Sequence, residues 1–337
     1  MTIGHNKFVI NLDVDGGDNA PISVLKGAEL YLNTNNNVNF NLYGRANTIN
    51  SYIENFPLLK RYSKIVECEG VIDGNLKPAE AMKKQFRNSS LAKSIFSLKN
   101  QPLHATVSSG NTGAMMSYSK IFLRTIENIS RPAIASLLPS KIHPVCFLDL
   151  GANAECDENN LVDFAVMGSI YYQILFPDSP SKVSLLNIGS EELKGNTIIQ
   201  KTHELLKNNN SINYNGFIEA NEITNTENNI IVTDGFTGNI ALKTAEGISK
   251  FITESLKEHL LSSLFSKILT FFLKKNLKSF KKSIDPRNFN GGILLGIDGI
   301  VIKSHGNADD YAFCNAISFA VKCLKSNLLK KIKDNAR

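Results

Sequence analysis

The polar turn at residues 108–113 has a composition suited to anion binding. It reads Ser-Ser-Gly-Asn-Thr-Gly after the apolar run 104–107, so we expect a short strand to end there and a helix to begin at Asn111 or Thr112. Small residues let backbone N–H groups approach a ligand, and a helix start adds N–H groups without partners. A turn with no ligand is the plain alternative. The residues predicted to bind phosphate are Ser108, Ser109, Gly110, Asn111 and Thr112.

Four other turns share this mixture of glycine and short polar side chains. They lie at residues 13–18, 189–196, 233–239 and 302–307. In the first of them, Gly16 and Gly17 allow a ligand to approach the backbone closely. Its aspartates are interpreted as turn and cap residues, because no matching set of metal ligands accompanies them. We predict no metal and no other cofactor.

Three basic side chains in these turns are candidates for catalysis, together with Asn111. His305 suits a general acid or base, or an anion ligand, because imidazole titrates near neutral pH; a structural histidine is the alternative. Lys303 precedes it by two residues, and Lys194 precedes a predicted helix start. Either ammonium would stabilise a phosphate or an oxyanion, whereas the alternative for Lys194 is a solvated side chain.

The turns around Lys194 and at residues 233–239 also contain predicted substrate-binding residues. These are Asn196, Asp234, Gly235 and Asn239. Asp234 follows an apolar run, so it either binds a ligand or caps the helix that comes next.

Several familiar nucleotide and catalytic motifs are absent. The chain contains no GxxxxGK[ST], no GxGxxG after its first strand and no GxSxG, which argues against a P-loop, a dinucleotide site and an esterase-like serine. Its five cysteines show no zinc-ligand spacing and are expected to be reduced and mostly buried. A nucleophilic Cys146 is the alternative for one of them.

The order of predicted elements indicates an α/β fold. Predicted strands at 8–14, 38–43, 64–68, 104–107, 133–138, 145–150, 183–189, 213–219 and 230–233 alternate with helical segments of about 10 to 20 residues. This alternation is typical of a mainly parallel sheet covered by helices on both faces. Ligands of such sheets bind beyond the carboxyl ends of the strands, so we expect the turns to gather there.

Composition and charge restrict the class of partner. The 337 residues are 42% hydrophobic and 20% charged, without a run long enough to span a membrane and without a signal-peptide pattern. The net charge is +6, and residues 262–284 contain six lysines and no acid. The rest of the chain is formally neutral, so the basic character points to one local anionic surface and not to nucleic acid.

Residues 255–284 form an amphipathic helical segment. The apolar face drifts between its two halves, which predicts a bend or a helical hairpin near 272–276. One interpretation is a dimer interface with a solvated lysine face, and the other is contact with an anionic membrane surface; both can hold together. The predicted membrane contacts are Leu264, Phe265, Ile268, Phe271, Phe272, Lys274 and Lys275.

Taken together, these segments resemble the PlsX family of bacterial phosphate acyltransferases (acyl-ACP:phosphate transacylases). The matching segments follow the family's order over nearly the whole chain, at residues 13–18, 87–90, 107–114, 131–135, 148–153, 164–168, 186–196, 234–239 and 299–306. Two positions differ: Asp15 stands where an apolar residue is usual, and Ser109 where alanine is usual. Asp15 would either add negative charge near the phosphate or point outward.

The resemblance implies a three-layer α/β/α fold related to phosphotransacetylases and isocitrate dehydrogenases, as one PlsX-type domain over residues 1–337 with a projecting helical segment at about 250–285. It further implies a cytoplasmic homodimer that associates peripherally with the membrane. The implied reaction converts acyl-ACP and inorganic phosphate to acyl phosphate and ACP, early in phospholipid synthesis, for use by a membrane glycerol-3-phosphate acyltransferase. Acidic ACP would dock on Arg87, Arg131 or the lysine cluster.

Two other functions remain open from the sequence. One is a CoA-dependent enzyme of the phosphotransacetylase type, and the other is a non-catalytic membrane scaffold. The phosphate chemistry itself needs no serine or cysteine nucleophile, because phosphate is already a nucleophile that must be desolvated and held against the thioester carbonyl.

Overall fold

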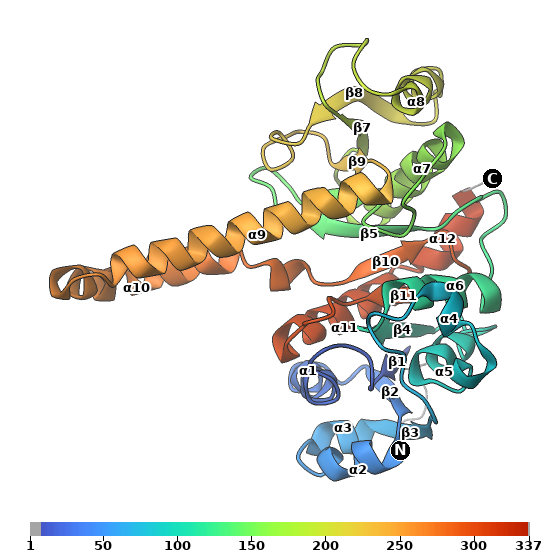
Figure 1. The fold of residues 1–337 in the computed structure, drawn as a ribbon, viewed down its shortest axis with the longest axis vertical. Coiled ribbons are helices and arrows are strands. Elements are labelled where there is room, and N and C mark those ends of the chain that lie inside the picture. Colours follow the sequence, from blue (N-terminus) through green and yellow to red (C-terminus); the bar gives the residue numbers. More distant parts are fainter. Residues whose placement is uncertain (1–7, 336–337) are drawn as a thin grey trace.

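The computed structural model describes residues 8–335, and for residues 264, 266–269, 271 and 281–283 it describes the backbone alone. Within this part of the chain eleven strands form one sheet, in the order β3-β2-β1-β4-β11-β10-β5-β6-β9-β7-β8 (Figure 1). The strands are β1 (Phe8–Asp13), β2 (Val38–Gly44), β3 (Ser63–Glu67), β4 (His104–Ser108), β5 (Ala133–Leu138), β6 (Val145–Leu148), β7 (Lys182–Asn187), β8 (Asn213–Glu219), β9 (Ile230–Val232), β10 (Gly292–Leu295) and β11 (Ile300–Lys303).

Helices cover both faces of this sheet. They are α1 (Ile22–Leu32), α2 (Ala46–Ile53), α3 (Pro57–Tyr62), α4 (Pro78–Ala81), α5 (Ser90–Phe96), α6 (Thr112–Phe122), α7 (Glu158–Leu175), α8 (Thr197–Lys207), α9 (Gly235–Leu260), α10 (Leu264–Ser283), α11 (Asp310–Lys325) and α12 (Leu328–Asn335), with 3-10 turns η1 (Lys84–Phe86) and η2 (Pro286–Phe289).

Successive side chains of a strand enter two separate hydrophobic cores. In β11, Ile300 and Ile302 pack in the core that includes residues of α1, α7 and α11, whereas Val301 packs in the core with α5 and α6. This alternation follows from the period of two in a strand. The predicted three-layer α/β/α fold is therefore confirmed.

The direction of the strands reverses in the middle of the sheet. Strands β1, β2, β3, β4 and β11 are parallel to one another, and β6, β7, β8 and β9 form a second parallel block. Between the blocks, β10 pairs antiparallel with β11 and β5, and β5 pairs antiparallel with β6. Three reversals leave the two blocks running in opposite directions, so their carboxyl ends lie at opposite edges of the sheet.

Some elements differ from the sequence expectations. The two four-residue strands β10 and β11 were not predicted. Residues 78–86 contain two short pieces, α4 and η1, and no longer helix. The amide N–H groups of Lys83 and Phe86 bond to the carbonyls three residues before them, so the chain turns here without completing an α-helix.

Helices α9 and α10 form a hairpin that extends from the body of the molecule (Figure 1). The predicted bend near 272–276 is wrong, because α10 is continuous there and the chain turns at residues 261–263. The turn contains Ser262, whose hydroxyl donates to the carbonyl of His259 at 2.8 Å and competes with the helical hydrogen bonds. Among the described helices, none combines the length and hydropathy needed to cross a bilayer.

Candidate active site

The polar turns divide between two edges of the sheet. Segments 13–18, 108–113 and 303–306 follow β1, β4 and β11, and we call this group the Asp13 edge. Segments 149–153, 187–196 and 234–239 follow or end β6, β7 and β9, and we call this group the Lys194 edge. The five polar turns lie at the carboxyl ends of strands, as expected, but at two opposite edges of the sheet, because the strand direction reverses between the two blocks.

A buried carboxyl group fills the centre of the Asp13 edge. The Ser108 hydroxyl donates to Asp13 Oδ2 at 2.6 Å and accepts from the N–H of Gly110 at 2.9 Å. A Cβ atom on Gly16 would lie 2.2 Å from the same carboxyl oxygen, so only glycine fits there. Burial raises the pKa of Asp13 to about 6. The turn predicted to bind phosphate thus already holds an acid of the protein itself.

The loops of this edge are packed against one another. The N–H of Asp18 donates to the Gly306 carbonyl at 2.8 Å, and a Cβ on Gly17 (φ +105°) would lie 2.6 Å from Ser109 Cβ. Three buried oxygens, Ser109 Oγ, Asp13 Oδ1 and Asp15 Oδ1, have no hydrogen-bond partner within the described residues. Gly16 and Gly17, the two glycines predicted to bind substrate, therefore allow loops of the protein to pack closely.

Two predicted catalytic side chains at this edge are engaged in internal hydrogen bonds. Lys303 donates to the carbonyls of Ser109 at 3.2 Å and Ser304 at 2.6 Å, and burial lowers the pKa of Lys303 to about 8. Asn111 caps α6 by accepting from the N–H of Ala114 at 2.9 Å. Its amide nitrogen donates to the carbonyls of residues 73, 74 and 76, so the side chain holds the 73–76 loop against the start of α6 at Thr112.

Asp15, which differs from the family pattern, is directed away from this turn but is not exposed. Its Oδ2 accepts from the backbone N–H of Arg45 at 3.1 Å and lies 3.5 Å from Arg45 Nε. The aspartate side chain is 1% exposed. It connects the end of β1 to the start of α2.

His305 lies at the outer side of the Asp13 edge. Its backbone N–H donates to Asn290 Oδ1 at 3.0 Å, and its ring Nε2 lies 3.4 Å from Glu246 Oε2 on α9. The imidazole is partly exposed. It connects this edge of the sheet to the projecting helix α9.

At the Lys194 edge, a second buried carboxyl group organises the loop after β6. Asp149 accepts four hydrogen bonds, from the N–H groups of Ile134, Ala152 and Asn153 and from the Asn153 amide. Burial nevertheless raises the pKa of Asp149. Asp149 and Asn153 were not among the predicted site residues, although the run Asp-Leu-Gly-Ala-Asn after an apolar strand was a readable signal.

The start of α9 is packed directly onto that loop. Gly235 donates its N–H to the Asn153 carbonyl at 2.8 Å, and a Cβ on Gly238 would lie 1.9 Å from the Asp149 carbonyl oxygen. Asp234 caps the helix by accepting from the N–H and the hydroxyl of Thr237, each at 2.8 Å. The Asn239 amide lies beside Gly151 and, within the described residues, has no hydrogen-bond partner.

The loop between β7 and α8 carries Lys194. Asn187 holds the loop by donating to the Lys194 carbonyl at 3.2 Å, and Asn196 caps α8 by accepting from the N–H of Ile199 at 2.9 Å. The Lys194 side chain is exposed, and in the part of the chain described here its ammonium has neither a hydrogen-bond nor an ion-pair partner. Because β7 and β9 are parallel neighbours, Lys194 and the starts of α8 and α9 share this edge.

Large apolar side chains are exposed on the loop that carries Lys194 and at the start of α9. Their exposed fractions range from 51% to 90%, which is high for aliphatic and aromatic residues. They are Ile188, Leu193, Phe236 and Ile240. The Lys194 edge therefore combines an unpaired cation, an unpaired amide and an apolar surface.

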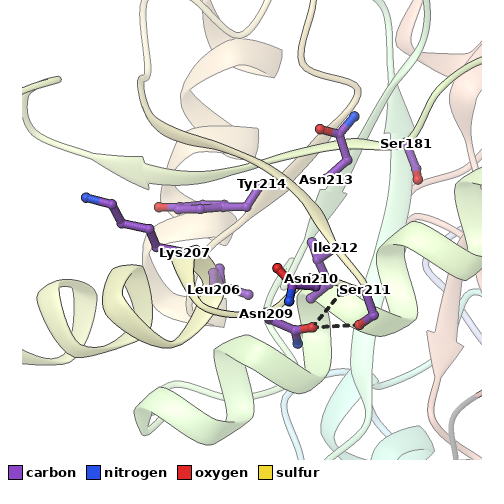
Figure 2. Close-up of a pocket in the computed structure, with 9 residues that line it drawn as sticks. All are labelled: Ser181, Leu206, Lys207, Asn209, Asn210, Ser211, Ile212, Asn213 and Tyr214. Atoms are coloured by element: carbon purple, nitrogen blue, oxygen red, sulfur yellow. Dashed lines mark hydrogen bonds between the residues drawn. The ribbon is translucent and has the colours of Figure 1, made fainter.

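A pocket of about 530 Å³ lies elsewhere, between the end of α8 and the start of β8 (Figure 2). Its polar residues include Asn209, whose side-chain oxygen accepts from the N–H and hydroxyl of Ser211 at 3.0 and 2.7 Å. It contains none of the predicted site residues and lies at the amino end of β8, away from the Lys194 loop. Among the described residues there is also no group of three or more His, Cys, Asp or Glu placed to hold a metal ion.

Solved structures share this fold at low sequence identity. A EutD phosphotransacetylase from Staphylococcus aureus is 15% identical with a TM-score of 0.61, covering 95% of this chain and 94% of that one. A phosphotransacetylase from Streptococcus pyogenes is 13% identical with a TM-score of 0.63 and the same coverage. The predicted relation to the phosphotransacetylase fold is confirmed.

Sequence relatives extend over almost the whole chain. A phosphate acyltransferase from Pelagibacter ubique is 42% identical over 328 residues, which are 97% of this chain and 98% of that protein. One from Wolbachia pipientis is 39% identical over 333 residues, 97% and 96% of the two chains. The family model described as "Fatty acid synthesis protein" matches residues 8–331. The chain therefore belongs to the phosphate acyltransferase family, a family of transferases.

Proposed function

We propose that the protein transfers an acyl group from acyl carrier protein to inorganic phosphate, producing acyl phosphate and free carrier protein. A phosphate oxygen attacks the thioester carbonyl, the C–O bond forms, the C–S bond breaks, and the carrier thiolate leaves and takes up a proton. Membership of the phosphate acyltransferase family supports this reaction. It would supply an acyl phosphate early in phosphatidic acid synthesis.

The observation that carries the proposal is the unpaired Lys194 ammonium at an edge where two helices begin. Helix starts carry a partial positive charge, and α8 and α9 both begin here, where Asn196 and Asp234 cap them. Lys194 would bind the attacking phosphate or the tetrahedral oxyanion, and the Asn239 amide would donate a further hydrogen bond. The surrounding apolar residues would accept the thioester and the start of the acyl chain.

The Asp13 edge fits this chemistry less well. Ser108, Asn111 and Lys303 use their polar groups on the protein itself, and Asp13 lies beside the N–H of Gly110. A phosphate there would have to displace these bonds and approach a buried acid. We therefore assign this edge to holding loops together, and the phosphate to the Lys194 edge.

The hairpin suits two further contacts, with a second copy of the chain and with a membrane. Along α9, exposed apolar residues recur at helical spacing and suit the apolar face of a homodimer. They are Ile248, Phe251, Ile252 and Leu256.

On α10, Phe265 and Phe272 are 71% and 77% exposed, and Lys274 and Lys275 are exposed. This combination suits the anionic inner face of the cytoplasmic membrane, where product could pass to a glycerol-3-phosphate acyltransferase. The side chains of Leu264, Ile268 and Phe271 lie outside the described residues. Flotation with vesicles that contain or lack anionic lipid tests the contact, and binding that ignores lipid charge would contradict it.

A second candidate is transfer from acyl-CoA, because the structural neighbours are phosphotransacetylases. The decisive experiment follows thiol release from acyl-ACP and from acyl-CoA, with and without inorganic phosphate. Our proposal expects release from acyl-ACP that requires phosphate and yields acyl phosphate. Faster release from short acyl-CoA would favour the second candidate. No release from either thioester would favour a non-catalytic membrane scaffold.

A further inference from the structure

Helix α9 joins the proposed reaction site to the hairpin but has few contacts with the body. Of its 26 residues, only Gly235 and Gly238, both in the first turn, are buried. Ala241 and Leu242 pack partly against the core with α5 and α6. Beyond them the helix is largely exposed, so its direction depends on the few contacts that remain.

One of these contacts is charged. Glu246 Oε2 lies 3.4 Å from His305 Nε2, and within the described residues this is the one ion-pair contact between α9 and the rest of the chain. The His305 end of the contact is rigid. Its N–H bonds to Asn290, which in turn donates to Ser304 Oγ at 2.8 Å and to the Ala312 carbonyl at 2.7 Å.

Glu246 lies near the middle of α9, so its contact with His305 influences both ends of the helix. Asn239 lies seven residues before it, roughly 10 Å along the axis, and Leu260 lies fourteen residues after it, roughly 21 Å away. Because Gly235 and Gly238 are packed onto the loop after β6, a change of tilt at Glu246 displaces the hairpin most and shifts Asn239, which follows this packed turn, by less.

We propose that Glu246 is a positioning residue that, paired with His305, sets the direction of α9 and so places Asn239 at the Lys194 edge. The inference rests on the proposed function for its effect on catalysis, but the effect on α9 stands independently of it. In this role His305 does not act on the substrate. It anchors the helix to the loop that follows β11.

The contact is expected to be stronger in mildly acidic solution. A histidine forms a full ion pair with a carboxylate only when it is protonated, and lower pH favours protonation. Other charged groups around this point are Lys243 on α9, Asp18 before α1, Lys303 on β11 and Asp309 at the start of α11. Within the described residues, Glu246 is the acid that lies within 4 Å of the imidazole.

Hydrogen–deuterium exchange of the peptide at residues 247–260 tests the contact without substrate. Glu246→Gln should raise its exchange about two- to fivefold at pH 6, after correction for intrinsic rates, and less at pH 8, since a partly exposed ion pair contributes about 0.4–1 kcal/mol. His305→Gln should have the same effect, and the peptide should exchange no faster in the double variant than in either single variant. Glu254→Gln is the matched control, because Glu254 lies on the same helix and approaches only Lys250, at 3.9 Å.

The same variants should lose about two- to fivefold in kcat/KM with acyl-ACP and phosphate at pH 6, and less at pH 8. A Glu246→Gln protein that exchanges like wild type at pH 6, or an effect that adds to that of His305→Gln, would overturn the inference. If the wild type shows no phosphate-dependent thiol release, the proposed function is wrong. The exchange measurement still tests whether the Glu246–His305 contact holds α9.

Discussion

At the Asp13 edge, a buried acid accepts from Ser108 in the centre of the turn, and the nearby Lys303 ammonium is bonded to two carbonyl oxygens. At the Lys194 edge, the buried acid Asp149 accepts hydrogen bonds from its own loop, and the exposed lysine has no partner among the described residues. Both edges combine glycine turns, an aspartate and a lysine. We propose from this difference that such a set forms a ligand site only where its charges are not already paired within the protein.

The largest predicted effect is on Lys194. Lys194→Ala should lower kcat/KM for phosphate-dependent thiol release about 10²–10³-fold, because an oxyanion would lose a charged partner. Lys201→Ala, on the next helix and paired with Glu158 at 3.4 Å, should stay within about threefold. Steady-state kinetics on both variants checks this. If the Lys194 variant were as active as the Lys201 variant, phosphate binding would have to be assigned to the Asp13 edge instead.

The second prediction concerns the buried acid of the Asp13 edge. Burial raises the pKa of Asp13 from 3.8 to about 6, so the folded state holds this proton more tightly than the unfolded state does. Ionisation of Asp13 therefore costs stability as the pH rises through this window, by up to about 3 kcal/mol.

Asp13→Asn removes that cost while keeping an oxygen for Ser108. Relative to wild type, its free energy of unfolding should increase by up to about 3 kcal/mol between pH 4 and pH 7, which means a relatively more stable variant. Urea unfolding at several pH values measures the trend. The exposed Asp178, as Asp178→Asn, supplies the control, and a flat difference for the Asp13 variant would show that this acid is not held as the structure indicates.

A third prediction compares two asparagines, one at each edge. Asn239→Ala should lower kcat/KM about 10- to 100-fold, since a hydrogen bond to a charged group contributes roughly 1.5–3 kcal/mol. Thr244→Ala, on the exposed side of the same helix, should leave it unchanged.

Asn111→Ala should act mainly on stability. It loses the cap of α6 and the bonds to the 73–76 loop, which should cost about 1–2 kcal/mol in unfolding free energy while kcat/KM of the folded protein stays within about threefold. Denaturant titration and kinetics on the same preparation separate the two effects. A kcat/KM loss greater than for Asn239→Ala would reverse our assignment of the edges.

The family and the fold class were readable from the sequence, for identifiable reasons. Apolar runs such as 104–107 and 230–232 ended in polar glycine turns, and their alternation with amphipathic helices predicted a covered sheet. The hairpin was expected from the apolar and lysine-rich rows of 255–284, but its turn was misplaced. Ser262 ends the helix through a local hydrogen bond, which the drift of an apolar face does not reveal.

The sequence by itself thus determined which segments are helical and which glycines, acids and lysines follow the strands. Only the tertiary structure decided which of those turns meet. The four-residue strands β10 and β11 were too short to predict, and the antiparallel pairing of β10 and β5 with their neighbours sends the carboxyl ends to opposite edges. Strand direction is set by long-range pairing, so the separation of Lys194 from Lys303 has no local signature in the chain.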